Sequence, residues 1–350
     1  MPSTRSAQRS QEPSLDQLAG QRVIYAYSGT EPPVSLVRAI RAGEAGGVIL
    51  FGDNVASPNQ VRAVIGRLQQ ASLASPTHAR LLVLVDQEGG EVRRLPGAPL
   101  LSEKQIGGSP NAVRLARTAG VSTGRELARA GVNVNLAPVL DVYGQAGDYI
   151  DQDQRSYSSA PAVVARVGSA FIASQEAAGV AATAKHFPGL GAATQAQDTD
   201  VRPVILPQSS AIVRSIGEAP YRAAISAGIK LVMLSWAIYP ALDPHLPAGL
   251  SPTVIQQELR ERLGFRGLTV TDSIDAGAVT PFGTLANRSV KAAAAGDDLI
   301  LAATTNPEQN TPLLGVSVMH ALASALATHR LSRAAALQTA HRILALRIRP

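Results

Sequence analysis

Short apolar, β-rich runs alternate with longer helical patterns along almost the whole chain, and this alternation limits the folds that it can adopt. Eight runs are predicted as strands, at residues 23–27, 47–51, 81–86, 132–138, 180–185, 229–235, 267–272 and 298–301. Helical patterns separate and follow them, at residues 34–44, 59–74, 112–130, 162–178, 209–227, 252–263, 285–295, 315–328 and 332–347. Eight strands separated by helices favour an α/β fold, and within it a closed, single-domain (β/α)8 TIM-type barrel over an open sheet.

The domain organisation follows from length and from what the sequence lacks. A chain of 350 residues is long enough for one large domain or two smaller ones. No linker-like stretch or internal repeat divides it, so we expect residues 17–350 to form one barrel domain behind a disordered leader at residues 1–16. No signal peptide is visible in the first twenty residues. The compartment stays open, because a cytoplasmic chain and an exported one whose signal has been removed would look the same.

Composition excludes several classes of function. The chain is 45% hydrophobic and 17% charged, which fits a globular protein with a sizeable core, and no apolar run is long enough to cross a membrane. It contains no cysteine, which excludes disulfides, thiolate metal sites and a cysteine nucleophile. The net charge of +6 comes mostly from arginines that we expect to be scattered over the helices. Such a surface favours anionic polymers in general, but no basic cluster is interleaved with aromatic residues, so we predict no nucleic-acid ligand.

Polar residues stand where several predicted strands end. Asp86 ends one strand and is followed by the turn Gly89-Gly90, Lys185-His186 ends another before a glycine-rich turn, and Asp272 ends a third. The loops that follow the strands of a βα barrel build its active site. Because a buried carboxylate is costly unless it is paired, these residues indicate one common site.

Each of these residues also has an ordinary structural interpretation. Asp86 fits a helix cap or a turn, Asp272 with Ser273 fits the cap of the next helix, and a lone His186 fits a hydrogen-bonded core histidine. An Asp/His/Asp metal site is conceivable, but no helical His pair or Asp-x-Asp spacing supports it. The chemistry that suits the set is sugar chemistry, in which a carboxylate attacks the anomeric carbon in a retaining glycosidase.

Five motifs occur in a fixed order within residues 18–346. They are DQEGGEVRRL at 86–95, GVN with APVLDV within 131–142, RSY at 155–157, KHFPG at 185–189 and LGFRGLTVTD at 263–272. Together they resemble the motifs of glycoside hydrolase family three, specifically its single-domain β-N-acetylglucosaminidase branch. The resemblance implies a (β/α)8-type barrel and a retaining β-N-acetylhexosaminidase, acting on terminal β-linked N-acetylglucosamine, for example in fragments of cell-wall peptidoglycan. It implies no cofactor and no metal.

The resemblance also assigns roles to individual residues. Asp272 matches the nucleophile that forms the glycosyl-enzyme. The residues similar to those that hold the sugar hydroxyls at the innermost subsite are Asp86, Arg94, Arg155, Lys185 and His186.

The loop that should carry the acid/base departs from the family pattern. In this branch the loop after KHFPG reads GHG and then supplies Asp-Ser-His, whose histidine is the acid/base. Here Leu190 replaces the first histidine, and the loop contains no histidine up to Asp200. Depending on the gap allowed, Asp198 or Asp200 falls on the acid/base position, and either would serve if burial or a neighbouring charge raised its pKa. The alternative is that both are solvated loop residues. A second departure is Trp236, where the family commonly has a histidine.

Two other functions stay open. One is a sugar-binding protein that keeps the innermost subsite but has lost turnover. The other is a glycoside phosphorylase, which the basic residues of the site permit. The sequence leaves the exact sugar, the aglycone and the oligomeric state undetermined, with a monomer as the expectation.

Overall fold

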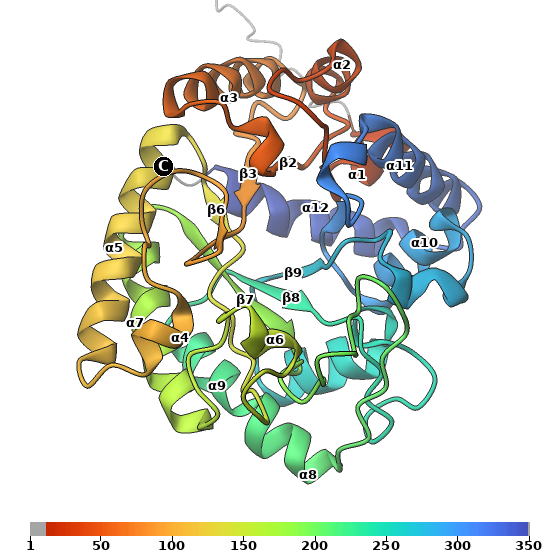
Figure 1. The fold of residues 1–350 in the computed structure, drawn as a ribbon. Coiled ribbons are helices and arrows are strands. Elements are labelled where there is room, and N and C mark those ends of the chain that lie inside the picture. Colours follow the sequence, from red (N-terminus) through yellow and green to blue (C-terminus); the bar gives the residue numbers. More distant parts are fainter. Residues whose placement is uncertain (1–11, 349–350) are drawn as a thin grey trace, which may run out of the picture.

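The computed structural model describes residues 12–348, which form a closed barrel of parallel strands inside a ring of helices (Figure 1). The strands are β1 (Val23–Tyr25), β2 (Gly47–Leu50), β3 (Leu82–Val85), β6 (Val134–Asn135), β7 (Ala181–Phe187), β8 (Leu231–Leu234), β9 (Leu268–Thr271) and β10 (Ile300–Ala302). They neighbour one another in chain order, β10 pairs with β1, and a bridge between Val270 and Leu299 joins β9 to the start of β10. The predicted eight-stranded α/β barrel is confirmed.

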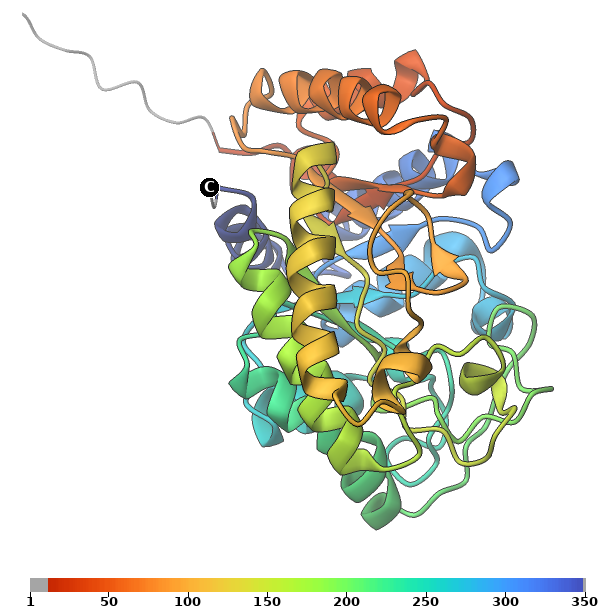
Figure 2. The same cartoon turned by 60° about the vertical axis from the view of Figure 1, so that its left-hand side comes forward.

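Helices cover the outside of the barrel (Figure 2). The longer ones are α1 (Leu15–Gly20), α2 (Val34–Ala42), α3 (Pro58–Leu73), α5 (Ala112–Ala130), α7 (Pro161–Ala177), α9 (Ala219–Ser226), α10 (Leu285–Ala295), α11 (Pro312–Ala327) and α12 (Arg333–Arg347). The short helices α4 (Glu103–Gly107), α6 (Tyr149–Gln152) and α8 (Ser210–Ile212) lie in connections. The helices predicted at 112–130 and 285–295 have the predicted bounds. The one predicted at 209–227 is divided by a π-helical turn at Val213–Gly217, and the one at 252–263 is π-helical over Thr253–Arg262.

The predicted leader, residues 1–16, lies mostly outside the described residues. Its last two residues, Leu15 and Asp16, already belong to α1. The helix begins there because the Ser14 side chain accepts a hydrogen bond from the Gln17 N–H at 3.1 Å, which caps the first turn. No helix within residues 12–348 has the length and apolar character needed to cross a membrane.

The interior of the barrel is a packed core. Apolar side chains of the strands, such as Ile24, Leu84 and Val270, are buried inside it. Ile343 of α12 joins the same cluster, and α12 ends beside the first residues of β3 and β7, so this helix covers the amino-terminal end of the barrel. The carboxyl-terminal end of the strands is left for polar side chains.

Two features of that end differ from the prediction. Lys185 and His186 lie inside β7, which runs on to Phe187, rather than after the strand. The strand continues because Phe187 still pairs with Leu234 of β8 beyond a register shift. A small hairpin of β4 (Gln87–Gly89) and β5 (Val92–Arg93) also follows β3, and the sequence analysis did not predict it.

Candidate active site

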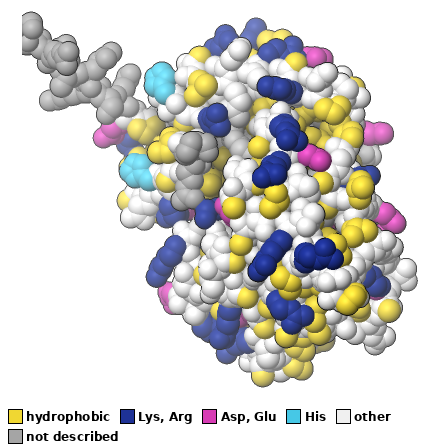
Figure 3. All heavy atoms as spheres, turned by 90° about the vertical axis from the view of Figure 1, so that its left-hand side faces the viewer, with side chains coloured by type: hydrophobic (Ala, Val, Ile, Leu, Met, Phe, Trp, Pro, Cys, Tyr) yellow, Lys and Arg dark blue, Asp and Glu magenta, His cyan; other side chains and the backbone are white. Residues whose placement is uncertain are grey.

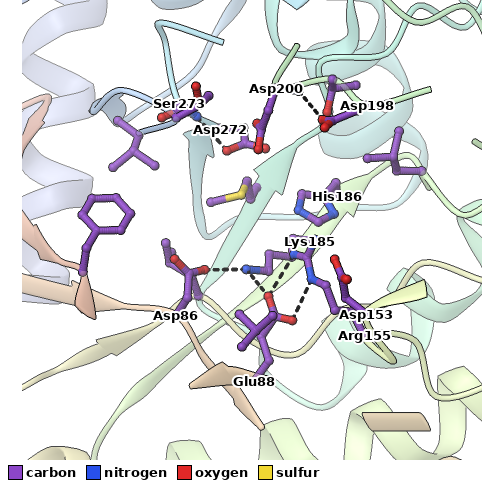
Figure 4. Close-up of a pocket in the computed structure, with 18 of the residues that line it drawn as sticks. Asp86, Glu88, Asp153, Arg155, Lys185, His186, Asp198, Asp200, Asp272 and Ser273 are labelled. Atoms are coloured by element: carbon purple, nitrogen blue, oxygen red, sulfur yellow. Dashed lines mark hydrogen bonds and ion pairs between the residues drawn. The ribbon is translucent and has the colours of Figure 1, made fainter. Parts of the chain in front are cut away.

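One cavity at the carboxyl-terminal end of the barrel brings together all eight predicted site residues (Figure 4). Its volume is about 340 Å³, within the range of small-molecule sites. The residues are Asp86, Arg94, Arg155, Lys185, His186, Asp198, Asp200 and Asp272. Because they come from the ends of four strands, β3, β6, β7 and β9, and from the connections that follow them, only the closure of the barrel brings them together.

Paired charges form one wall of the cavity. The Nζ of Lys185 lies 2.6 Å from Oδ1 of Asp86 and 2.7 Å from Oε1 of Glu88. The Nε and Nη2 of Arg155 donate to the two Glu88 oxygens at 2.9 Å each. Figure 4 shows these four side chains converging below His186. The Asp86 side chain is 15% exposed and bonds Lys185 through one oxygen, so within the described chain its other oxygen is available to a ligand.

This wall keeps its charges at neutral pH. Burial would raise the pKa of Glu88, but the positive charges of Arg155 and Lys185 and their hydrogen bonds outweigh it and lower that pKa to about 2. Burial would likewise lower the pKa of Lys185, but the charges of Asp86 and Glu88 raise it on balance. The orientation of the donors is therefore set before any ligand binds.

We expect Glu88→Gln to lower the free energy of unfolding at pH 7 by about 3–5 kcal/mol, because it leaves two buried cations without their shared carboxylate. The folded-state pKa of Glu88 is about 2, below the usual value near 4.3 in an unfolded chain. Its contribution is therefore complete above the unfolded pKa and is lost as the pH falls toward 2. Urea unfolding at several pH values measures this, with exposed Glu308→Gln as the control; equal losses in both variants at pH 7 would contradict it.

A buried aspartate that the sequence analysis did not select holds His186. The Nδ1 of His186 lies 2.7 Å from Oδ2 of Asp141, which is fully buried. Asp141 also accepts the backbone N–H groups of His186, at 3.2 Å, and of Leu190, at 2.6 Å. A carboxylate bound to one imidazole nitrogen orients the ring and leaves the other nitrogen for the cavity. The only available signal was the position of Asp141 at the end of the APVLD run.

The Asp198–Asp200 loop is hydrogen-bonded to the segment that follows Asp272. The Asp200 N–H donates to Oδ1 of Asp198 at 2.8 Å, and the Asp200 carbonyl accepts the Gly277 N–H at 2.8 Å. A Cβ at Gly277 would lie 2.1 Å from the carbonyl oxygen of Val201, so only glycine allows this approach. These contacts keep Asp200 beside Asp272.

Asp200 has the electrostatic character of an acid. Its surroundings in the cavity withdraw it from bulk water, and the charges of Asp272 and Asp198 act in the same direction, so that its pKa rises from 3.8 to about 7. Arg155 and His186 oppose this shift. Asp200 is nevertheless an exposed residue at the cavity mouth, so water moderates the effect until a ligand displaces it. The Asp200 carboxyl therefore holds its proton more tightly than an ordinary aspartate does.

Tyr149 of α6 is a further cavity residue that the sequence analysis missed. The pKa of its hydroxyl is raised by burial and by the negative charges of Asp200 and Asp198. Its backbone N–H donates to the Ala193 carbonyl at 3.1 Å, so α6 packs on the loop that carries both aspartates. Tyr149 lies between the recognised motifs, where no sequence signal distinguishes it.

Asp272 directly follows β9 and has no cation within ion-pair distance in the described part of the chain. Its Oδ1 accepts the Ser273 N–H at 2.7 Å. Behind this turn, the Nε1 of buried Trp236 donates to the Ser273 carbonyl at 2.9 Å. Trp236 does not line the cavity, so this second departure from the family pattern supports the aspartate from behind.

We expect Trp236→Phe to lower kcat by about threefold to tenfold with little change in KM, because it removes one buried hydrogen bond worth roughly 0.5–1.5 kcal/mol behind Asp272. Steady-state kinetics on an aryl glycoside measures this. Tyr221→Phe is the control, since the buried Tyr221 hydroxyl has no hydrogen-bond partner among residues 12–348. An unchanged kcat with lowered thermal stability would assign Trp236 a purely structural role.

Comparisons with known proteins agree with this architecture. The family model described as "Glycosyl hydrolase family 3 N terminal domain" matches residues 15–346. A protein of Arthroderma benhamiae named "Uncharacterized secreted glycosyl hydrolase" is 41% identical over 333 residues, which cover 95% of this chain and 92% of that protein. A "Beta-hexosaminidase" of Nitrosomonas eutropha is 35% identical over 303 residues, 85% of this chain and 83% of the relative.

A solved structure has the same fold. It is a glycoside hydrolase family 3 β-N-acetylglucosaminidase from Paenibacillus sp., with a TM-score of 0.88 and 34% identity. The similarity covers 95% of this chain and 62% of the solved chain, so this chain spans somewhat less than two thirds of that protein.

Proposed function

This chain belongs to glycosyl hydrolase family 3, and we propose that it is a retaining β-N-acetylhexosaminidase that releases terminal β-linked N-acetylglucosamine. Membership of the family, together with the β-hexosaminidase relatives, makes it a glycoside hydrolase. The observation that carries the finer proposal is that Asp272 and Asp200 line the same cavity. The opposite side of that cavity is formed by the ion-paired side chains of Asp86, Lys185 and Arg155. We also propose cell-wall fragments as a source of substrate, on the family resemblance alone.

In the proposed ground state, the terminal sugar occupies the cavity and its hydroxyls bind the charged wall. The residues that bind them are Asp86, Arg94, Arg155, Lys185 and His186. Fixed, water-excluding donors and acceptors of this kind orient the anomeric carbon toward the attacking group.

In the first chemical step, a carboxylate oxygen of Asp272 bonds to the anomeric carbon while the bond to the leaving oxygen breaks. Asp200 transfers its proton to that oxygen, so the aglycone departs as an alcohol. In the second step, the Asp200 carboxylate takes a proton from water, the water oxygen bonds to the anomeric carbon, and Asp272 is released. Two inversions give net retention.

The charge of Asp272 itself switches Asp200 between these two roles. Before attack, the Asp272 carboxylate helps to raise the pKa of Asp200 and keeps it protonated. Once Asp272 is esterified its charge is gone, so the pKa of Asp200 falls and the group becomes a base. Asp198 is proposed as the residue that positions Asp200, because its side chain already accepts the Asp200 N–H.

The proposal is tested by following hydrolysis of 4-nitrophenyl β-N-acetylglucosaminide by proton NMR. We expect the β-anomer of N-acetylglucosamine as the first product, before mutarotation. The matching β-glucoside and α-linked substrate serve as controls. Initial release of the α-anomer would contradict retention, and saturable sugar binding without any turnover would favour the binding-protein alternative.

A further inference from the structure

Three neighbouring helices of the barrel wall carry more basic than acidic side chains. The helices α3, α5 and α7, of 16, 19 and 17 residues, carry seven arginines and two glutamates. This surplus of five compares with a net charge of +6 for the whole chain. Arginines also occur on other helices, two on α2 and three on α12, so they are scattered over the helices as the sequence analysis expected.

Most of these arginines are free of acidic partners. Arg67 pairs with Glu31, whereas the other six are exposed and make no ion pair with the described residues. The six are Arg62, Arg114, Arg117, Arg125, Arg129 and Arg166. The two glutamates are already engaged: Glu126 accepts the Ala98 N–H at 2.6 Å, and Glu176 accepts the Ala182 N–H at 2.9 Å.

These side chains share one face of the molecule, which we call the basic face: the outer surface of α3, α5 and α7 with the six arginines just named. The helix α5 packs between the other two, and Figure 3 shows that arginines and lysines far outnumber acidic residues on this side. Along α5, a shallow groove is lined by Arg117, Thr118, Val121, Ser122, Arg125, Glu126 and Arg129, so its three arginines outnumber its one acidic residue. The helix is about 28 Å long at 1.5 Å per residue, so the charge is spread over a distance that a small anion cannot span.

We propose that the basic face binds a linear anionic polysaccharide, beside and separate from the active site. Guanidinium groups bind carboxylate, sulfate or phosphate oxygens in pairs, and hydroxyl side chains between them suit sugar hydroxyls. None of the residues that line the active-site cavity comes from α3, α5 or α7. The face would hold a charged polymer near the enzyme without occupying the cavity.

The composition of the face favours a polysaccharide over the other large polyanions. The one aromatic residue on the three helices is Phe171, which is 1% exposed, so no ring is available for stacking on bases. Of the large apolar side chains that are exposed, Leu73 at the end of α3 is the one on this face, which leaves little to insert into a membrane.

The test measures binding of fluorescent dextran sulfate to the full chain at several salt concentrations. The variant Arg117→Gln/Arg125→Gln/Arg129→Gln removes three charges from the groove. The control Arg41→Gln/Arg266→Gln/Arg330→Gln removes three exposed arginines from other elements. At about 50 mM salt we expect at least about tenfold weaker binding for the groove variant only, with a salt slope lower by about one per arginine. Hydrolysis of a small aryl glycoside should be unchanged in both variants.

Equal weakening of both triple variants would overturn the proposal, because it would indicate a general effect of net charge. So would equal binding of uncharged dextran. Tighter binding of a DNA duplex or of phosphatidylglycerol vesicles than of dextran sulfate, compared at the same concentration of negative charge, would assign the face to another class of partner and overturn the polysaccharide assignment.

Discussion

Replacing Asp272 by asparagine should lower kcat on 4-nitrophenyl β-N-acetylglucosaminide by about 10⁴-fold or more, while the protein stays folded. The asparagine has nearly the same shape, but its amide is too weak a nucleophile to form the glycosyl-enzyme. The fold should tolerate the change, because Asp272 makes no ion pair in the described chain and its one backbone contact, to the Ser273 N–H, can be accepted by an amide oxygen.

Measuring sugar binding as well as turnover distinguishes the loss of the nucleophile in Asp272→Asn from damage to the binding site. The dissociation constant for N-acetylglucosamine should change by no more than a few fold, since the charged wall of the cavity is untouched. Calorimetric titration of the free sugar and a thermal unfolding curve provide both controls. If Asp272→Asn kept a tenth or more of the wild-type kcat, Asp272 would not be the nucleophile.

Replacing Asp200 by asparagine should cost about 10²–10⁴-fold in kcat/KM on substrates with an ordinary sugar alcohol as leaving group. The loss should be much smaller with 2,4-dinitrophenol as leaving group, because that phenolate departs without a proton. This dependence on the leaving group distinguishes a missing acid from a misfolded cavity. Asp198→Asn is the matched control, and its loss should vary less with the leaving group.

The pH dependence gives a second, independent result for Asp200. As an acid, Asp200 must carry its proton, and its pKa is raised to about 7 by desolvation at the cavity mouth and by the charges of Asp272 and Asp198. For the wild type, kcat/KM on a poor leaving group should therefore fall as the pH rises through about 7. Asp200→Asn should lose this basic limb. A limb that persists unchanged in the variant would assign the titration to another group.

Much of the fold is predictable because the barrel strands are short, apolar and regularly spaced. The helices α5 and α10 have their predicted bounds because strong signals stand at their ends: Gly131 in a left-handed conformation ends α5, and the Thr284 side chain caps α10. The π-helical segment at 253–262 could not be predicted, because its apolar spacing is compatible with an ordinary helix.

The site was predictable as a set of residues but not as a network. Motif positions indicated Asp86, Lys185 and Asp272, whereas Glu88 and Asp141 acquire their roles from partners distant in sequence. Arg155 lies 67 residues from Glu88, and His186 lies 45 residues from Asp141. The sequence left Asp198 and Asp200 equivalent. Asp200 differs from Asp198 in that its backbone carbonyl accepts a hydrogen bond from the Gly277 N–H, which holds it near Asp272. This contact joins residues distant in sequence, so no local sequence pattern predicts it.

The most direct test of the retaining mechanism is to trap its covalent intermediate. A 5-fluoro-N-acetylglucosaminyl fluoride slows both chemical steps but retains a good leaving group, so the glycosyl-enzyme should accumulate. Mass spectrometry of the intact protein and of its peptides should find one added sugar, on Asp272, and none in Asp272→Asn. A sugar attached to another residue, or steady hydrolysis of the reagent by Asp272→Asn at the wild-type rate, would contradict the proposed mechanism.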